Sequence, residues 1–112
     1  MGELNKLQEY LMTNGYYFKR IDKTVPKEMK DIYVKHFGKY SGEGERHQII
    51  VYSDSEGCPD EIWFDVICQW GSYGYDKGLL EISGPTGLCD NHESGVEGWL
   101  TAQDIIDRLE DI

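Results

Sequence analysis

A ten-residue segment, QWGSYGYDKG from Gln69 to Gly78, places glycines between large aromatic side chains and lies between two runs that resemble β-strands. Glycines permit positive φ angles and close backbone approach, and the aromatic side chains could form a stacking surface. The segment matches neither phosphate-binding signature, because a P-loop ends in Gly-Lys-Ser/Thr and the dinucleotide fingerprint leads into a helix. It therefore either connects two strands and covers the edge of the core, or presents a site.

As a site, this segment could act in two ways. Trp70, Tyr73 and Tyr75 could anchor a protein interface, because Tyr and Trp bury a large area at low entropic cost. The same side chains could sandwich a nucleobase, with glycine amides and Lys77 at its phosphates. The local excess of acidic residues disfavours this second use.

The other nucleophiles and bases do not form a catalytic pattern. His36, His47 and His92 fall in a predicted helix, at a strand start and in a loop. His47, beside Arg46, is the best isolated candidate for acid–base chemistry, but hydrogen bonding to backbone at a strand end explains it more simply. Ser72 in Gly-Ser-Tyr-Gly lacks the Gly-x-Ser-x-Gly nucleophile elbow. We expect no enzymatic activity.

The three cysteines predict reduced thiols rather than disulfides. Cys58, Cys68 and Cys89 are odd in number and far apart, unlike a disulfide framework. Cys68 lies in the apolar run IWFDVIC and is typical of a small core residue. A zinc set could be assembled with His92, but structural zinc sites usually offer two short-spaced ligand pairs and this chain has one. We expect neither metal nor cofactor.

The charge of the chain is negative and unevenly distributed. The net charge is −10; residues 1–40 hold eight Lys or Arg against five acids, and residues 41–112 hold three against sixteen. Such a field repels phosphates, so we expect no direct nucleic-acid binding by the acidic part. It attracts basic proteins, and carboxylates can occupy a groove whose Lys and Arg normally bind phosphates. Acidity of this size would also simply keep a small protein soluble.

If the acidic surface is functional, we expect the partner to be a basic nucleic-acid-binding protein. The expected contact residues are the aromatic anchors and the acids around them: Trp70, Tyr73, Tyr75, Asp60, Glu61, Asp76, Glu81, Glu93 and Glu97.

Three helices are predicted from apolar spacing. Residues 3–15 form an amphipathic helix whose Leu4, Leu7 and Leu11 share one face. Thr24 can cap a second helix with Pro26 in its first turn. The apolar stripe of that helix comprises Met29, Ile32, Tyr33 and Phe37. Residues 99–112 supply the last helix, with Thr101 and Asp104 resembling a capping box.

Three strands are predicted between the second and third helices. Residues 47–53 and 61–68 read as a β-hairpin, and LLEIS at 79–83 reads as a third strand. Residues 15–22 could form a brief edge strand or an extended connection. The expected fold is a single α+β domain over residues 1–112, a three-stranded antiparallel sheet packed with two N-terminal helices and one C-terminal helix. The chain has neither a long apolar run nor a signal-peptide pattern, so we expect a soluble cytoplasmic protein.

The segments ICQWGSYGYDKGLLEISG and VEGWLTAQDIIDRLE resemble small acidic proteins carried by phages and mobile elements of Gram-positive bacteria. The resemblance covers about residues 46–110, where an Ile-Cys-Gln-x-Gly-Ser-Tyr-Gly-Tyr segment and a Val-Glu-Gly-Trp-Leu-Thr helix start recur. Proteins of this kind include anti-CRISPR proteins, many of which mimic nucleic acid and bind a Cas nuclease. The resemblance thus implies a non-enzymatic inhibitor of a defence nuclease in the host cytoplasm.

Two features leave other functions open. The basic first forty residues depart from a pure nucleic-acid mimic and suggest contact with two surfaces of opposite sign. A binder that sequesters a signalling nucleotide through residues 69–78 is one alternative, and a structural or regulatory phage protein is another.

Overall fold

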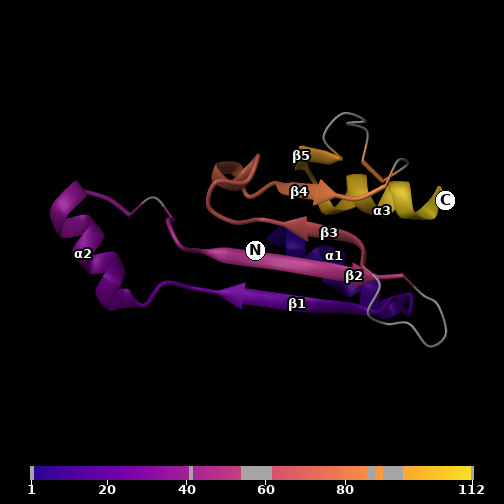
Figure 1. Ribbon diagram of the computed structural model, residues 1–112, viewed down its shortest axis with the longest axis horizontal. Helices are drawn as coiled ribbons and strands as arrows, with labels where there is room; N and C mark the ends of the chain where they lie inside the picture. Colours follow the sequence, from indigo (N-terminus) through magenta and orange to yellow (C-terminus); the bar gives the residue numbers. More distant parts are fainter. Residues whose placement is uncertain (1, 41, 54–61, 86–87, 90–94, 112) are drawn as a thin grey trace.

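The computed structural model describes residues 2–40, 42–53, 62–85, 88–89 and 95–111 of the chain. Its elements, in chain order, are α1 (Gly2–Thr13), β1 (Phe18–Lys23), α2 (Lys27–Phe37), β2 (Arg46–Tyr52), β3 (Ile62–Ile67), β4 (Leu80–Ser83), β5 (Val96–Leu100) and α3 (Ala102–Glu110). The molecule is elongated, with extents of 50 × 28 × 22 Å (Figure 1). None of the helices in these ranges is long and apolar enough to cross a membrane.

The strands form one antiparallel sheet in the order β1-β2-β3-β4-β5. The α+β class is confirmed, but the expected three strands are wrong because β1 and β5 extend the sheet at its two edges. β1 pairs with β2 from Phe18↔Val51 to Lys23↔Arg46, so the segment after α1 is an edge strand. β5 follows a turn-rich segment and contains Gly98, and glycine weakens the sequence signal of a strand.

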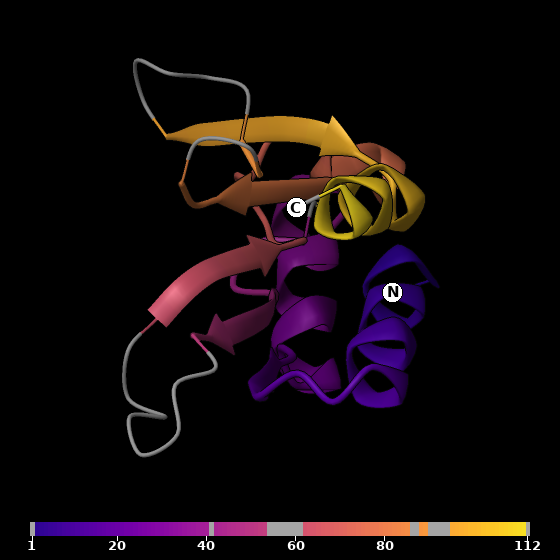
Figure 2. The ribbon, with the colours of Figure 1, turned by 90° about the vertical axis from the view of Figure 1, so that its right-hand side faces the viewer.

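Helices α1 and α3 cover the same face of the sheet, and the core lies between these two layers (Figure 2). The predicted leucine face of α1 is confirmed, because all three leucines are fully buried. The sheet contributes alternating residues of its inner strands, as the period of two requires. The buried apolar residues are Leu4, Leu7, Leu11, Ile49, Val51, Phe64, Val66, Cys68, Leu80, Ile82, Leu88, Cys89, Leu100, Ala102, Ile105 and Leu109.

Hydrogen bonds join the amino-terminal end of α3 to α1. The predicted capping box is confirmed: the Thr101 hydroxyl accepts from the Asp104 N–H at 3.2 Å, and the Asp104 carboxylate accepts from the Thr101 N–H at 2.9 Å. The carboxylate of Glu3 in α1 accepts the Ala102 N–H at 2.7 Å. The N–H groups of Thr101, Ala102 and Asp104 are thus all hydrogen-bonded, and the bond to Glu3 fixes α3 beside α1.

Helix α2 does not pack on the sheet, so the prediction that both N-terminal helices pack against it is right for α1 and wrong for α2. It lies in the connection between β1 and β2, at one end of the long axis and away from α1 and α3 (Figure 1). None of its residues is buried. Its N-cap is Pro26, which makes no side-chain cap bond, so Thr24 is not the cap. The apolar spacing correctly predicted the helix but not its place.

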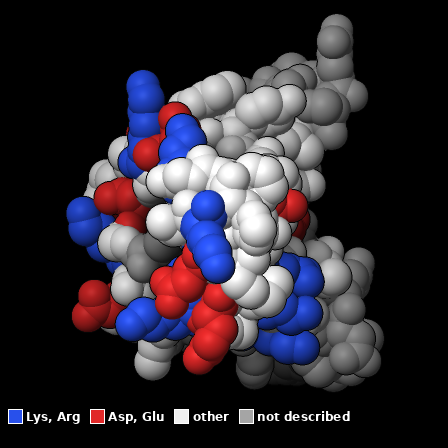
Figure 3. Space-filling model, turned by 90° about the vertical axis from the view of Figure 1, so that its left-hand side faces the viewer, with Lys and Arg blue, Asp and Glu red and all other residues white. Residues whose placement is uncertain are grey.

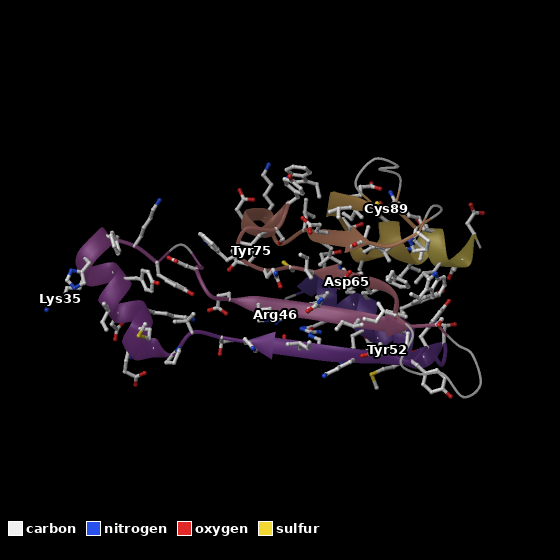
Figure 4. All side chains as sticks on the ribbon, viewed as in Figure 1. Lys35, Arg46, Tyr52, Asp65, Tyr75 and Cys89 are labelled. Carbon is white, nitrogen blue, oxygen red and sulfur yellow. The ribbon has the colours of Figure 1, made fainter. Side chains whose placement is uncertain are left out.

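The face of the sheet opposite α1 and α3 is not covered by a helix in the described ranges (Figure 2). A polar ladder crosses it: Arg46 donates to the Gln48 amide oxygen at 2.7 Å, and the Gln48 amide donates to the Asp65 carboxylate at 2.9 Å. Figure 4 shows Arg46 and Asp65 over neighbouring strands. These side chains satisfy one another, so the ladder reads as a structural feature of the open face.

Candidate protein-binding surface

An exposed aromatic pair lies where the β3–β4 connection meets β5. The rings of Tyr73 and Trp99 are 5.2 Å apart between centroids and inclined by 30°. Both side chains remain 57% exposed, and Trp70 in the same connection is 47% exposed. Large aromatic side chains with this exposure are the usual anchors of protein interfaces. We call these three residues the aromatic surface.

The local sequence explains how the β3–β4 connection turns. The Ser72 hydroxyl donates to the Gln69 carbonyl at 2.6 Å and accepts the Gln69 N–H at 3.0 Å, which closes a tight turn. Gly71 and Gly74 then adopt positive φ angles of 88° and 92°, which favour glycine. A 3₁₀ turn at Tyr75–Lys77 leads into β4. Ser72 therefore has a structural role in the turn.

Two glycines let this connection pack closely against β5. A Cβ atom at Gly98 would lie 2.2 Å from the Tyr73 Cβ, and one at Gly74 would lie 2.9 Å from the Leu79 Cβ and 3.2 Å from the Trp99 Cα. The space that a side chain at either glycine would need is thus filled by other atoms of the chain. This use of glycine favours the interpretation as a packed connection over a glycine cradle for phosphate.

Trp99 has an unusual backbone conformation. Among the described residues it is the one non-glycine with positive φ, at 57°. An L-residue in this left-handed region is strained by about 1–2 kcal/mol. Such strain persists only where surrounding contacts impose it, and it is concentrated at functional sites. The sequence predicted residue 99 only as part of the segment that supplies the last helix, whereas it lies in β5, so this residue of the candidate site was missed.

Tyr75 is placed differently from Trp70 and Tyr73. Its ring packs against the core and against Gly42, where an added Cβ would lie 2.4 Å from the tyrosine hydroxyl oxygen. Burial raises the pKa of Tyr75, with the Glu45 carboxylate adding to the effect. Tyr75 therefore holds the connection in place and is not part of the aromatic surface.

The acids expected around these aromatics do not all present free charge. Asp76 is exposed, whereas Glu81 accepts the Tyr73 N–H at 3.0 Å and so orients the aromatic surface. Glu97 forms a two-bond ion pair with Arg108, at 2.8 and 2.9 Å, so its charge is compensated within the chain. The remaining three predicted acids, Asp60, Glu61 and Glu93, lie outside the described residues.

His47 lies between two carboxylates rather than bonding to backbone. Its Nδ1 is 2.7 Å from the Asp22 Oδ1, and its Nε2 is 3.7 Å from the Glu45 Oε2. The hydrogen bond with His47 lowers the pKa of Asp22, and the Arg20 guanidinium adds to this effect against the opposing effect of burial. Glu45 also pairs with Lys30 of α2 at 3.2 Å. The cluster therefore ties the base of α2 to the sheet.

The two described cysteines are buried thiols. Cys68 and Cys89 are at most 2% exposed and free, and burial raises the pKa of Cys68. The core position predicted for Cys68 is confirmed. The other two residues of the hypothetical zinc set, Cys58 and His92, lie outside the described residues. Within the described part of the chain, no three His, Cys, Asp or Glu side chains are grouped to hold a metal ion.

Compared with models of protein families, with curated proteins and with solved structures, the chain gives no significant match. The site is therefore interpreted from its own geometry and charge.

Proposed function

We propose that this protein is a non-enzymatic inhibitor that binds a basic nucleic-acid-binding protein through the aromatic surface of Trp70, Tyr73 and Trp99. A defence nuclease of the Cas type, in the host cytoplasm, is the proposed target class. The observation that carries the proposal is the exposed Tyr73–Trp99 pair, held on a backbone that is strained at Trp99.

The aromatic surface supports protein binding because its Tyr73–Trp99 pair is already ordered. The Tyr73 N–H is bonded to Glu81, and close packing on Gly98 fixes the position of Tyr73 beside Trp99. Preordered side chains lose less entropy on binding than flexible ones, so more of the contact energy appears as affinity. Exposed aromatic pairs of this kind are typical hot spots.

The charge of the chain supports a basic target. Residues 41–112 hold sixteen acids against three basic residues, and the exposed Asp76 follows the aromatic surface in the same connection. A groove lined with Lys and Arg for phosphates attracts such a surface and orients it during the encounter. The resemblance to phage proteins that include anti-CRISPR proteins agrees with this choice of target. Binding of this type weakens as salt rises, because exposed charges are screened.

A competition experiment tests the proposal. The protein is first used at low salt to capture nucleases from host cells, and the captured nuclease is purified and offered labelled nucleic acid. We expect the protein to displace the nucleic acid and to inhibit cleavage. Release of the nuclease by about half-molar salt would support the charge contribution.

Substitutions then locate the contact. Trp99→Ala and Tyr73→Ala should each weaken binding by at least about thirtyfold, the equivalent of ~2 kcal/mol. Tyr17→Ala is a matched control, because Tyr17 is equally exposed at 57% but belongs to the segment before β1. If no nuclease is captured, if a captured nuclease keeps its nucleic acid, or if all three variants bind equally, the proposal is wrong. A nucleotide that co-purifies with the chain would favour the sequestering alternative.

A further inference from the structure

Helix α2 exposes an apolar face that nothing in the described part of the chain covers. Met29, Ile32 and Phe37 are 46%, 51% and 73% exposed. With Tyr33 and Glu43 they line a shallow groove of about 440 Å³. At 100° per residue these apolar side chains fall on one side of the helix. A helix face of this kind normally packs against another element.

The side of this face that carries Tyr33 already contacts other residues of the chain. Tyr33 contacts Tyr40 at 5.5 Å between ring centroids, and Lys30 pairs with Glu45 at 3.2 Å. These contacts fix α2 against the chain that follows it. The side that carries Met29 and Ile32 is left for another molecule.

Two opposite charges flank Ile32 on this open side. Glu28 and Lys35 are both exposed, and neither has an ion-pair partner within the residues that the structure describes. They lie seven residues apart, so they share one edge of the helix about 10 Å apart along its axis. Lys35 points away from the body of the molecule (Figure 4).

This arrangement is self-complementary. If two α2 helices lie antiparallel about a two-fold axis near Ile32, Glu28 of each copy meets Lys35 of the other. The same patch then serves both copies, as a two-fold interface requires. Each helix carries three lysines and two acids, so its net charge is only +1 and repulsion between the paired helices is small. Figure 3 shows both signs of charge around an uncharged area at this end of the molecule.

The shape of the molecule permits this pairing. Because α2 lies at one end of the long axis, two copies joined through it place their acidic bodies at opposite ends (Figure 1). An anionic membrane or nucleic acid fits less well, since it would meet Glu28 on the helix, Glu43 in the groove and the negative field of the whole chain.

We propose that α2 is a dimerisation helix that binds α2 of a second copy in antiparallel orientation. Met29 and Ile32 of each copy lie in the groove of the other, and Glu28 of each copy forms an ion pair with Lys35 of the other. An eleven-residue helix is about 16 Å long, and its contact area falls below the ~800 Å² per partner of a standard interface. The dimer is therefore weak and depends on concentration. It is independent of the function proposed for the aromatic surface.

Sedimentation velocity of the full chain, over a wide range of concentration, tests this proposal. The wild type should shift from monomer to dimer. Glu28→Lys and Lys35→Glu should each raise the dissociation constant roughly tenfold, because each replaces two attractive pairs by repulsive ones. An equimolar mixture of the two variants should recover wild-type affinity, since opposite charges then face each other in the mixed dimer.

The matched control is Lys27→Glu, which makes the same charge change as Lys35→Glu but lies about 160° around the helix from Met29 and about 140° from Ile32, on the side turned away from the apolar face. It should leave dimerisation unchanged, whereas Ile32→Ser should abolish it. A chain that stays monomeric, a dimer that tolerates both single charge variants, or a mixture that fails to recover would each overturn the proposal. A monomer that instead floats with phosphatidylserine vesicles would assign α2 to a lipid surface.

Discussion

Replacing Trp99 by glycine and by alanine separates the strain of its backbone from the contacts of its side chain. Both variants lose the contact between the Trp99 and Tyr73 rings, which is worth about 0.5–1.5 kcal/mol. That loss cancels when the two variants are compared with each other. The comparison therefore reports on the backbone at position 99, where φ is 57°.

The expected difference in stability between the glycine and alanine variants has the opposite sign from the one found at an ordinary strand position. In a normal strand, glycine is less stable than alanine by roughly 0.5–1 kcal/mol because its unfolded chain has more freedom. At positive φ, alanine is strained by about 1–2 kcal/mol and glycine is not. When the ordinary effect is subtracted from the strain, the free energy of unfolding of Trp99→Gly should exceed that of Trp99→Ala by about 0–1.5 kcal/mol.

Urea unfolding followed by far-ultraviolet circular dichroism measures this difference, because the signal does not depend on the tryptophan removed. The control pair is Lys19→Ala and Lys19→Gly, at an exposed position of β1 without positive φ. Glycine should be the less stable variant there. If alanine is the more stable variant at position 99 as well, Trp99 is not strained and the argument from its backbone fails.

Three further predictions concern the contacts that hold the site and the sheet. Because the hydrogen bond with His47 lowers the pKa of Asp22, Asp22 stabilises the fold above pH ~4 and loses that contribution as the pH falls through its lowered value; Asp22→Asn should therefore be less stable than wild type at neutral pH, and this difference should shrink as the pH falls below ~4, measured by urea midpoints. Gly98→Ala places a Cβ 2.2 Å from that of Tyr73, so it should lower the stability by about 1–3 kcal/mol and weaken target binding, and an unchanged melting temperature would contradict the packing. Arg108→Lys loses the forked contact to its carboxylate partner on β5 and should cost about 1–3 kcal/mol in denaturant unfolding, whereas a neutral result would show that a single charge suffices.

Local patterns in the sequence predicted what local physics determines. The spacing of Leu4, Leu7 and Leu11 places them on one side of a helix whatever the tertiary structure, and all three are buried. The hydroxyl of Thr101 and the carboxylate of Asp104 bond only within their own turn, so the capping box could be found without the fold. The β2–β3 hairpin was also predicted, from two strand-like runs on either side of a polar, turn-rich segment.

What the sequence did not predict depends on distant contacts. An apolar stripe shows that a helix has a face to cover, not what covers it, so α2 was placed on the sheet with α1. Glu97 appeared as a free surface acid because its partner, Arg108, lies on α3 and meets it only in the folded chain. The position of Trp99 depends on the packing of Gly98 in β5 against Tyr73 in the β3–β4 connection. No local pattern in the sequence indicates that contact.

The strain at Trp99 bears directly on the proposed function. If stability alone mattered at this position, glycine would avoid the strain of the left-handed conformation at no steric cost. A tryptophan there, stacked on Tyr73 and still more than half exposed, adds little to the core and keeps a large apolar area in water. Under the proposed function, the cost of exposing the ring is recovered when another molecule covers it. Trp99→Gly should therefore fold at least as well as Trp99→Ala while losing target binding to the same extent, and a Trp99→Gly protein that still binds would move the contact away from this surface.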